Sequence, residues 1–211
     1  MKNIALFGGS GKTGQQFLKQ ALEAGYNVKA LVRNPEKISQ NSAQLKLIHG
    51  DVLDQKSVEE TIQGADIIVS LFGHVKGSPD WLQKDGTTLI VESMNKNGIK
   101  RIISLSGGGL PYPGKDEPKF FDHAIRTIMK ITVPSVLKDA QAHAEVLRNS
   151  SLDWEIVRGP ILTDTPLTGK YRVGWVGVNA GNKISRADLA HFIMKEVESP
   201  EYTKQLPMVS Y

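Results

Sequence analysis

The N-terminal stretch Asn3–Gly14, NIALFGGSGKTG, contains the pattern that decides the fold. Its first five residues, Asn3–Phe7, have the length and apolar character of a buried strand, and glycines follow directly. Beyond them, small and apolar residues recur with the period of a helix that has one buried face, namely Gly14, Phe17, Leu18, Ala21, Leu22 and Gly25. We therefore predict a strand, a tight glycine loop and an amphipathic helix at the start of the chain.

Strand-length apolar runs alternate with helical segments along the rest of the chain. Further strands are predicted at Val28–Arg33, Leu45–His49, Asp66–Phe72, Arg101–Leu105 and Trp154–Arg158. Four further helices are predicted. The first is capped by Asp54 and carries Val58 and Ile62, and the second runs from Ser78-Pro79 to about Asn97 and is ended by Gly98. The third lies at Leu137–Asn149, and the fourth is opened by Ser185–Asp188 and carries Leu189, Phe192, Ile193 and Val197.

This alternation of strands and helices predicts a doubly wound α/β fold of Rossmann type. Right-handed crossovers would place helices on both faces of a parallel sheet, with strand order 3-2-1-4-5-6. We expect one domain over residues 1–211. Residues from about 160 to 183 are rich in Gly and Thr, and we expect them to form an irregular excursion that shapes the substrate side.

Composition narrows the possible functions. The chain of 211 residues carries a formal net charge of +4 without blocks of Lys and Arg, so no nucleic-acid partner is expected. It has no cysteine, which excludes disulfides, thiolate metal sites and cysteine nucleophiles. The five histidines show no metal-ligand spacing. With no apolar run long enough to span a bilayer and no room for a signal peptide before the first strand, we expect a cytoplasmic protein.

The glycine loop predicts a dinucleotide site. The spacing G-x-x-G-x-x-G, directly between a strand and a helix, permits a tight turn and lets the backbone approach a pyrophosphate closely. The phosphates would then lie on the free N–H groups at the start of the helix. The predicted loop contacts are Gly8, Gly11, Lys12, Thr13 and Gly14.

The residue after the second predicted strand selects between the nicotinamide cofactors. NAD-selective sites carry Asp or Glu there to bind the ribose hydroxyls. This chain has Arg33-Asn34, and its next acid is Glu36. A guanidinium pairs with a 2′-phosphate that a carboxylate would repel, and Lys12 can add to the same pocket. We therefore predict NADP(H) in preference to NAD(H).

Other contacts are predicted where further strands end, because ligands of open α/β sheets bind at that edge. After the third strand these are Asp51 and Val52, near the adenine, although Asp51 as a plain turn residue is an equal alternative. After the fourth and fifth strands they are Leu71, Phe72, Gly73, Ser104 and Ser106.

The proton donor of ordinary short-chain dehydrogenases is absent. Those enzymes use a Tyr-x-x-x-Lys pair, and none of the five tyrosines here has a lysine four residues later. Reduction of a simple ketone, and chemistry on a sugar nucleotide, are disfavoured for this reason. Lys138, in the helix that would carry the pair, is the best-placed remaining cation, with a solvated surface lysine as the alternative reading.

Several segments together resemble the atypical short-chain dehydrogenases, within which the chain is similar to the NAD(P)H-binding group of NmrA-like proteins and biliverdin reductase B/flavin reductases. The segments are the glycine loop, LVRNPEK around Arg33, Gly50–Val52, Leu152–Pro160, Asp164–Tyr171 and Ser185–Phe192. Ala140 and Ile161 stand where the mammalian flavin reductases have histidines.

The resemblance implies hydride delivery from NADPH to a planar, delocalised small molecule such as a flavin, quinone or tetrapyrrole. Such a ring spreads the arriving charge, so a dedicated proton donor matters less. The family's substrate-site serine maps to Ser106, and Ser106 and Lys138 are the candidate residues that position the acceptor. A protein that senses NADP(H) without turnover, as NmrA-like proteins do, is the alternative.

Overall fold

A mostly parallel sheet forms the centre of the computed structural model, which describes residues 2–211, the side chain of Phe121 apart. Its strands follow the order β3-β2-β1-β4-β5-β6-β10-β8, so the predicted order of the first six is confirmed. These six are β1 (Asn3–Phe7), β2 (Asn27–Val32), β3 (Leu45–His49), β4 (Ile67–Ser70), β5 (Arg101–Gly107) and β6 (Asp153–Gly159), all paired in parallel.

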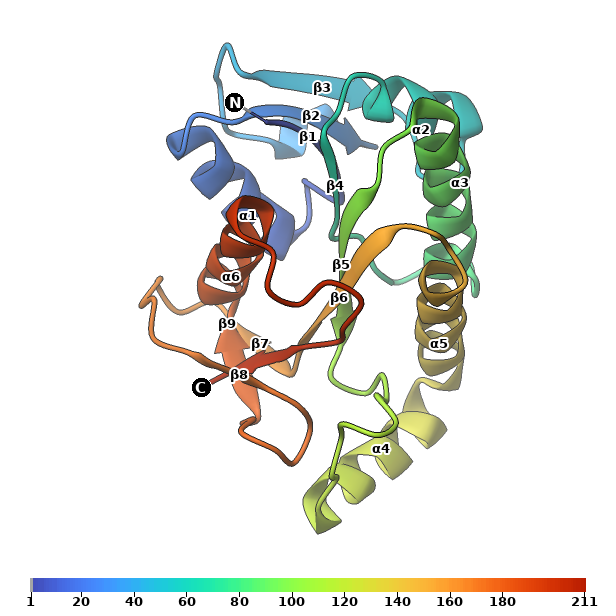
Figure 1. The fold of residues 1–211 in the computed structure, drawn as a ribbon, viewed down its shortest axis with the longest axis vertical. Helices are drawn as coiled ribbons and strands as arrows, with labels where there is room; N and C mark the ends of the chain where they lie inside the picture. The colour runs from blue at the N-terminus through green and yellow to red at the C-terminus, as the bar shows by residue number, and fades with distance from the viewer. Residues whose placement is uncertain (1) are drawn as a thin grey trace.

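Helices cover both faces of this sheet (Figure 1). One face carries α1 (Lys12–Glu23) and α6 (Arg186–Glu198), and the other carries α2 (Gln55–Ile62), α3 (Leu82–Asn97) and α5 (Pro134–Arg148). Alternate residues of each strand enter two separate cores, as the two-residue period of a strand requires. In β5, for example, Ile103 packs toward α1 and α6, whereas Ile102 packs on the opposite side.

The predicted start of α3 is wrong. Ser78 and Pro79 lie in the preceding loop, and the helix begins at Leu82 after Trp81, which supplies no capping oxygen. The carboxylate of Asp139 in α5 instead accepts the N–H groups of Gln83 and Lys84, at 2.7 and 2.8 Å. The cap comes from a residue more than fifty positions away, so the local sequence could not reveal it.

The excursion expected to be irregular contains two short strands. β7 (Ile161–Thr163) pairs in parallel with β9 (Lys183–Ser185) as a separate two-stranded sheet. β8 (Arg172–Gly174) runs antiparallel to β10 (Met208–Ser210), which extends the main sheet beyond β6. The chain also forms a 3₁₀ turn, η1 (Pro35–Lys37).

A further helix, α4 (Phe120–Thr132), was not predicted from the sequence. It follows the loop after β5 and stands out from the sheet at the lower end of the molecule in Figure 1. Its Ile128 and Ile131 are exposed, so its apolar residues do not mark a face buried in the core.

Candidate cofactor and acceptor site

The glycine loop between β1 and α1 is built for close backbone approach. Gly8 adopts φ +82°, and a Cβ there would lie 2.5 Å from the backbone nitrogen of Phe72. A Cβ on Gly14 would lie 2.1 Å from the carbonyl oxygen of Gly8. The N–H of Gly11 donates to the same carbonyl at 3.0 Å and closes the turn. Any larger residue at position 8 or 14 would therefore force this loop open.

The loop leads directly into the positive end of α1. Gly11 is the N-cap, no side chain caps this helix, and its first turn contains no acidic residue. The first N–H groups of a helix have no partner within the helix, so those of Lys12, Thr13 and Gly14 are directed toward the loop opening. Bare glycine backbone, unpaired amides and the helix dipole fit a pyrophosphate.

Arg33 lies at the carboxyl end of β2, as predicted from the sequence. Its Nε is 4.0 Å from Oδ2 of Asp51, which follows β3. Both side chains are largely exposed, so this pair contributes little to stability and leaves the guanidinium accessible. Asp51 also accepts the N–H of Leu53 at 2.9 Å, which holds its carboxylate in the turn.

Lys12 is paired with an acidic residue of a distant segment. Its ammonium donates to Asp164 at 2.9 Å, and Arg186 donates to the other oxygen of the same carboxylate at 2.6 Å. The hydrogen bond from Lys12, with further effects of Arg186, holds the pKa of Asp164 below its usual range. In this arrangement Lys12 ties the glycine loop to the segment after β7.

A small apolar wall adjoins the glycine loop. Leu71, Phe72 and Gly73 follow β4, and the N–H of Leu71 donates to the carbonyl of Phe7 at 2.8 Å. Gly86 in α3 allows the Phe72 ring and Val52 to approach, since a Cβ on Gly86 would lie 2.9 and 3.0 Å from them. The residues predicted after β3 and β4 are thus brought together at one edge.

The two serines of β5 have different environments. Ser104 is buried and hydrogen-bonds the imidazole of His143 in α5 at 2.8 Å. Burial lowers the pKa of His143 to about 4, despite the nearby charge of Asp139, so the ring is neutral at neutral pH. Ser106 is also buried, but its hydroxyl oxygen has no hydrogen-bond partner among the described residues.

The loop after β4 is fastened to α5 by a second histidine. His74 contacts the carboxylate of Asp139 at 2.6 Å, and Asp139 is fully buried. Asp139 and His143 stand four residues apart on α5, the spacing of the absent Tyr-x-x-x-Lys pair. Both are engaged inside the protein, and Lys138 beside them is exposed.

A cavity of about 720 Å³ opens at the carboxyl ends of β5 and β6. Its floor is the glycine-rich backbone of Gly107–Gly109 and Gly159, and α4 forms one wall. Met129 of α4 approaches the floor closely, because a Cβ on Gly109 would lie 3.0 Å from its Cε atom. Ser106 immediately precedes this floor in β5, but neither Ser106 nor Lys138 lines the cavity. This cavity is the space that the geometry offers to a second ligand.

A buried ion pair braces the cavity wall. Arg158 of β6 donates to both oxygens of Asp116, at 2.8 and 2.9 Å, and to the carbonyls of Leu206 and Leu110. Asp116 also accepts the N–H of Val176 at 3.1 Å. The loop after β5 and the turn after β8 are therefore both anchored to the sheet.

A second buried carboxylate organises the segment Asp164–Tyr171. Asp188, at the start of α6, accepts hydrogen bonds from the N–H groups of Thr168 and Gly169 and from the hydroxyl of Tyr211, at 3.0, 2.7 and 2.6 Å. Burial raises the pKa of Asp188, but these hydrogen bonds outweigh it and leave the pKa below the usual value. Ser185 caps α6 on the N–H of Asp188, as predicted.

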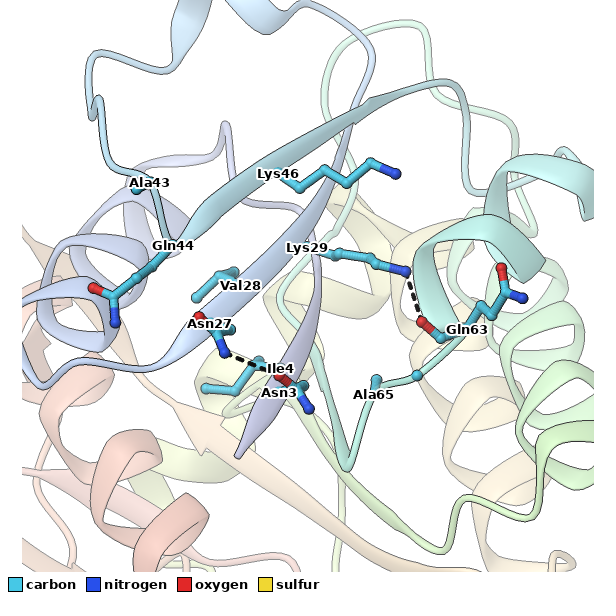
Figure 2. Close-up of a pocket in the computed structure, with 11 residues that line it drawn as sticks. Asn3, Ile4, Asn27, Val28, Lys29, Ala43, Gln44, Lys46, Gln63 and Ala65 are labelled. Carbon is cyan, nitrogen blue, oxygen red and sulfur yellow. Dashed lines mark hydrogen bonds between the residues drawn. The ribbon is translucent and has the colours of Figure 1, made fainter. Parts of the chain in front are cut away.

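Another hollow lies at the opposite edge of the sheet (Figure 2). It is lined by polar and apolar residues around the amino ends of β1–β3. There Lys29 donates to the carbonyl of Gln63 at 2.6 Å, and Asn27 donates to Asn3 at 3.1 Å. Ligands of open α/β sheets bind at the carboxyl edge. We therefore place the candidate site at the glycine loop and the 720 Å³ cavity.

Comparison with known proteins identifies the family. A family model described as NAD(P)H-binding matches residues 8–200. The chain belongs to this family. The match begins at the glycine loop, confirms the predicted resemblance to NAD(P)H-binding atypical short-chain dehydrogenases, and supports NAD(P)H binding by this protein.

The relatives of this NAD(P)H-binding protein differ in length. It is 24% identical to YwnB of Bacillus subtilis over 96% of its own length and 95% of that protein. It is 28% identical to dihydroflavonol 4-reductase of Solanum lycopersicum, with coverage of 75% of its own length and 50% of the reductase.

Solved structures share the whole fold. A short-chain dehydrogenase/reductase from Veillonella parvula in complex with NADP superposes with a TM-score of 0.80 at 18% identity, covering 100% of this chain and 94% of that one. The anaerobilin reductase ChuY from Escherichia coli O157:H7 gives 0.79 at 22% identity, with 99% and 96% covered. At these identities the likeness establishes the fold.

Several residues at the site were not predicted from the sequence. Five of them act through partners far away in the chain, so no local pattern marks them: His74, Asp116, Asp139, Arg158 and Arg172. The sixth, Arg126, lines the cavity without a hydrogen-bond or ion-pair partner among the described residues. None of the helices formed by residues 2–211 is long and apolar enough to cross a membrane. Within the same residues, no group of three or more His, Asp or Glu side chains is arranged to hold a metal ion.

Proposed function

We propose that this protein is an NADPH-dependent reductase of a planar conjugated acceptor such as a flavin, quinone or tetrapyrrole. One observation carries the proposal: the glycine loop and the 720 Å³ cavity open on the same carboxyl edge of the sheet. Two ligands can therefore meet between them. Family membership supplies the cofactor half of this proposal.

Cofactor binding is assigned to the residues at the ends of β1 to β4. The amides around Gly8–Gly14 would hold the diphosphate, Arg33 the 2′-phosphate, and Asp51 and Val52 the adenine edge. Leu71–Gly73 would pack along the middle of the bound cofactor. Bound NADPH supplies a hydride. The proposed preference for NADP(H) over NAD(H) rests on Arg33 alone. Asp51 beside it would contact a ribose hydroxyl, and that contact does not distinguish the two cofactors.

Acceptor positioning is assigned to Ser106. Its buried hydroxyl lacks a protein partner among residues 2–211, and such a group is costly unless a ligand or water satisfies it. It does not line the cavity but directly precedes the floor residue Gly107, and we propose that a polar atom on the ring of the acceptor reaches it there. Lys138 faces solvent, and we assign it no part in positioning the acceptor.

The missing proton donor is consistent with a delocalised acceptor. The two α5 residues at the Tyr-x-x-x-Lys spacing, Asp139 and His143, are committed to His74 and Ser104. No localised alkoxide needs to be protonated when a conjugated ring takes up the hydride, and solvent can supply the proton afterwards.

The proposal is tested by following NADPH absorbance at 340 nm with FMN, a soluble naphthoquinone and biliverdin as separate acceptors. We expect oxidation well above the protein-free rate with at least one of them, and a lower kcat in Ser106→Ala. Ser42→Ala, in the loop before β3, is the matched control. Background rates with all three acceptors would refute the reductase proposal.

A second candidate is a binding protein that senses NADP(H) without turnover. The internal use of Asp139 and His143 favours it, because it leaves no proton donor on α5 at the usual spacing. For such a sensor we expect tight NADPH binding and no turnover with any acceptor. The 340 nm assay, combined with a binding titration of the same preparation, separates the two functions.

A further inference from the structure

The 720 Å³ cavity has apolar walls with a basic margin. Ile125 and Met129 of α4 line it together with Pro160, Ile161 and Met208, and these side chains suit the faces of a ring system. Three cationic side chains also line it, Lys119, Arg126 and Arg172, together with one acid, Asp122. These side chains therefore give the cavity lining more positive than negative charge.

The single acid does not neutralise the arginines. The carboxylate of Asp122 accepts the backbone N–H of Lys119 at 2.8 Å, which commits one oxygen to the start of α4. Half-buried Arg126 makes no hydrogen bond or ion pair with any described residue. On the other side of the cavity, Arg172 uses one nitrogen to donate to the main-chain oxygen of Tyr211 at 2.8 Å, and its remaining donors stay available.

We propose that the acceptor carries an anionic group, a phosphate or a carboxylate, which Arg126 and Arg172 bind at the margin of the cavity. A guanidinium pairs with either group through two parallel hydrogen bonds, and an unpaired arginine beside an apolar cavity is the residue type expected for this role. The ring of the acceptor would lie in the cavity against the apolar side chains of Ile125, Pro160 and Ile161. This inference rests on the proposed function only in taking the cavity as the acceptor site.

Matched ligands test the charge requirement directly. FMN and riboflavin share one ring system and differ by a phosphate, and biliverdin differs from its dimethyl ester by two carboxylates. Binding is measured by quenching of flavin fluorescence or by bilin absorbance, with NADP⁺ at saturation so that the cofactor site is filled. We expect the anionic member of at least one pair to bind about tenfold more tightly or better.

Variants assign the effect to the arginines. Arg126→Gln and Arg172→Gln should each weaken the preferred anionic ligand by about tenfold while leaving its neutral partner unchanged. Lys130→Gln, which removes a charge of the same sign from α4 outside the cavity lining, is the control and should change neither. Which pair responds distinguishes a phosphate from a carboxylate.

The outcomes separate this inference from the reductase proposal. Equal binding of charged and neutral members in both pairs would overturn the anionic site, even if NADPH were oxidised. Selective, Arg126-dependent binding without NADPH oxidation would sustain the site and count against the reductase.

Discussion

Gly8 combines two constraints that separate substitutions can distinguish. Its φ is +82°, and a Cβ would contact the backbone of Leu71 and Phe72. Gly64 has φ +75° but nothing within 4 Å of its Cβ position. Both Gly8→Ala and Gly64→Ala should therefore lose about 1–2 kcal/mol of stability to the left-handed backbone. Only Gly8→Ala should also weaken NADPH, by about tenfold or more, because it displaces the diphosphate loop.

Thermal unfolding and titration calorimetry with NADPH measure the two effects separately. Equal NADPH affinity in Gly8→Ala and Gly64→Ala would mean that the diphosphate does not approach this loop.

Arg33 is assigned to the 2′-phosphate, which only NADPH carries. Removing one charge-assisted pair should cost about 1.5–3 kcal/mol, so Arg33→Ala is expected to weaken NADPH by about ten- to a hundredfold. NADH should be affected far less, because it has no group at that place. Dissociation constants for both cofactors test this, and equal losses would remove Arg33 from the phosphate site.

Single residues were predictable from the sequence where their role is set by neighbours along the chain. Gly8 and Gly14 stand out because a turn between a strand and a helix needs them locally, and Arg33 because it ends a recognisable strand. The pairing of Lys12 with Asp164 was not predictable, since it joins residues 152 positions apart. Arg126 was missed because α4 itself was not recognised.

At the scale of elements, the strands and helices with full hydrophobic periods were predicted within a few residues. β7, β8, β9 and β10 are three residues long, too short for an alternating pattern to register. The start of α3 was misplaced because Asp139, on another helix, supplies its cap. Short strands and tertiary caps are determined by packing.

The helix α4 provides a prediction at this scale, because it forms a cavity wall while standing outside the main layers. Thr127→Pro removes an interior hydrogen bond and should unfold the helix locally, at about 3 kcal/mol for the helix itself. We expect FMN or biliverdin binding to weaken by about tenfold or more. NADPH affinity and the main melting transition should change little.

Thr127→Ala is the control for α4, since it also deletes the hydroxyl that donates to the carbonyl of His123 but preserves the helix. Acceptor binding that survives Thr127→Pro would show that α4 is not part of the acceptor site.

For the whole molecule, a buried charge cluster at the amino edge of the sheet makes stability depend on pH. Arg101 donates to Glu155 at 2.5 Å and lies 3.7 Å from Glu196. Burial, reinforced by the charge of Glu196 and opposed by Arg101, raises the pKa of Glu155 to about 8. The unfolded chain releases this proton near pH 4.3, so the folded state binds more protons between these values.

The contribution of Glu155 to stability should therefore fall as pH rises from about 4.5 to 8. Glu155→Gln keeps a polar group beside Arg101 without the titration, and should flatten the change in melting temperature over that interval by a few degrees. Exposed Glu145→Gln in α5 is the control. If the pH dependence of the melting temperature were the same in Glu155→Gln as in the unmodified protein, Glu155 would not be the group that binds this proton.

A crystal structure of the protein soaked with NADP⁺ tests the central claim most directly. We predict the diphosphate on the amides of the Gly8–Gly14 loop, the 2′-phosphate within hydrogen-bond distance of Arg33, and the nicotinamide facing the cavity beside Ser106. A cofactor bound in the hollow at the amino edge of the sheet, or a nicotinamide turned away from the cavity beside Ser106, would contradict the account.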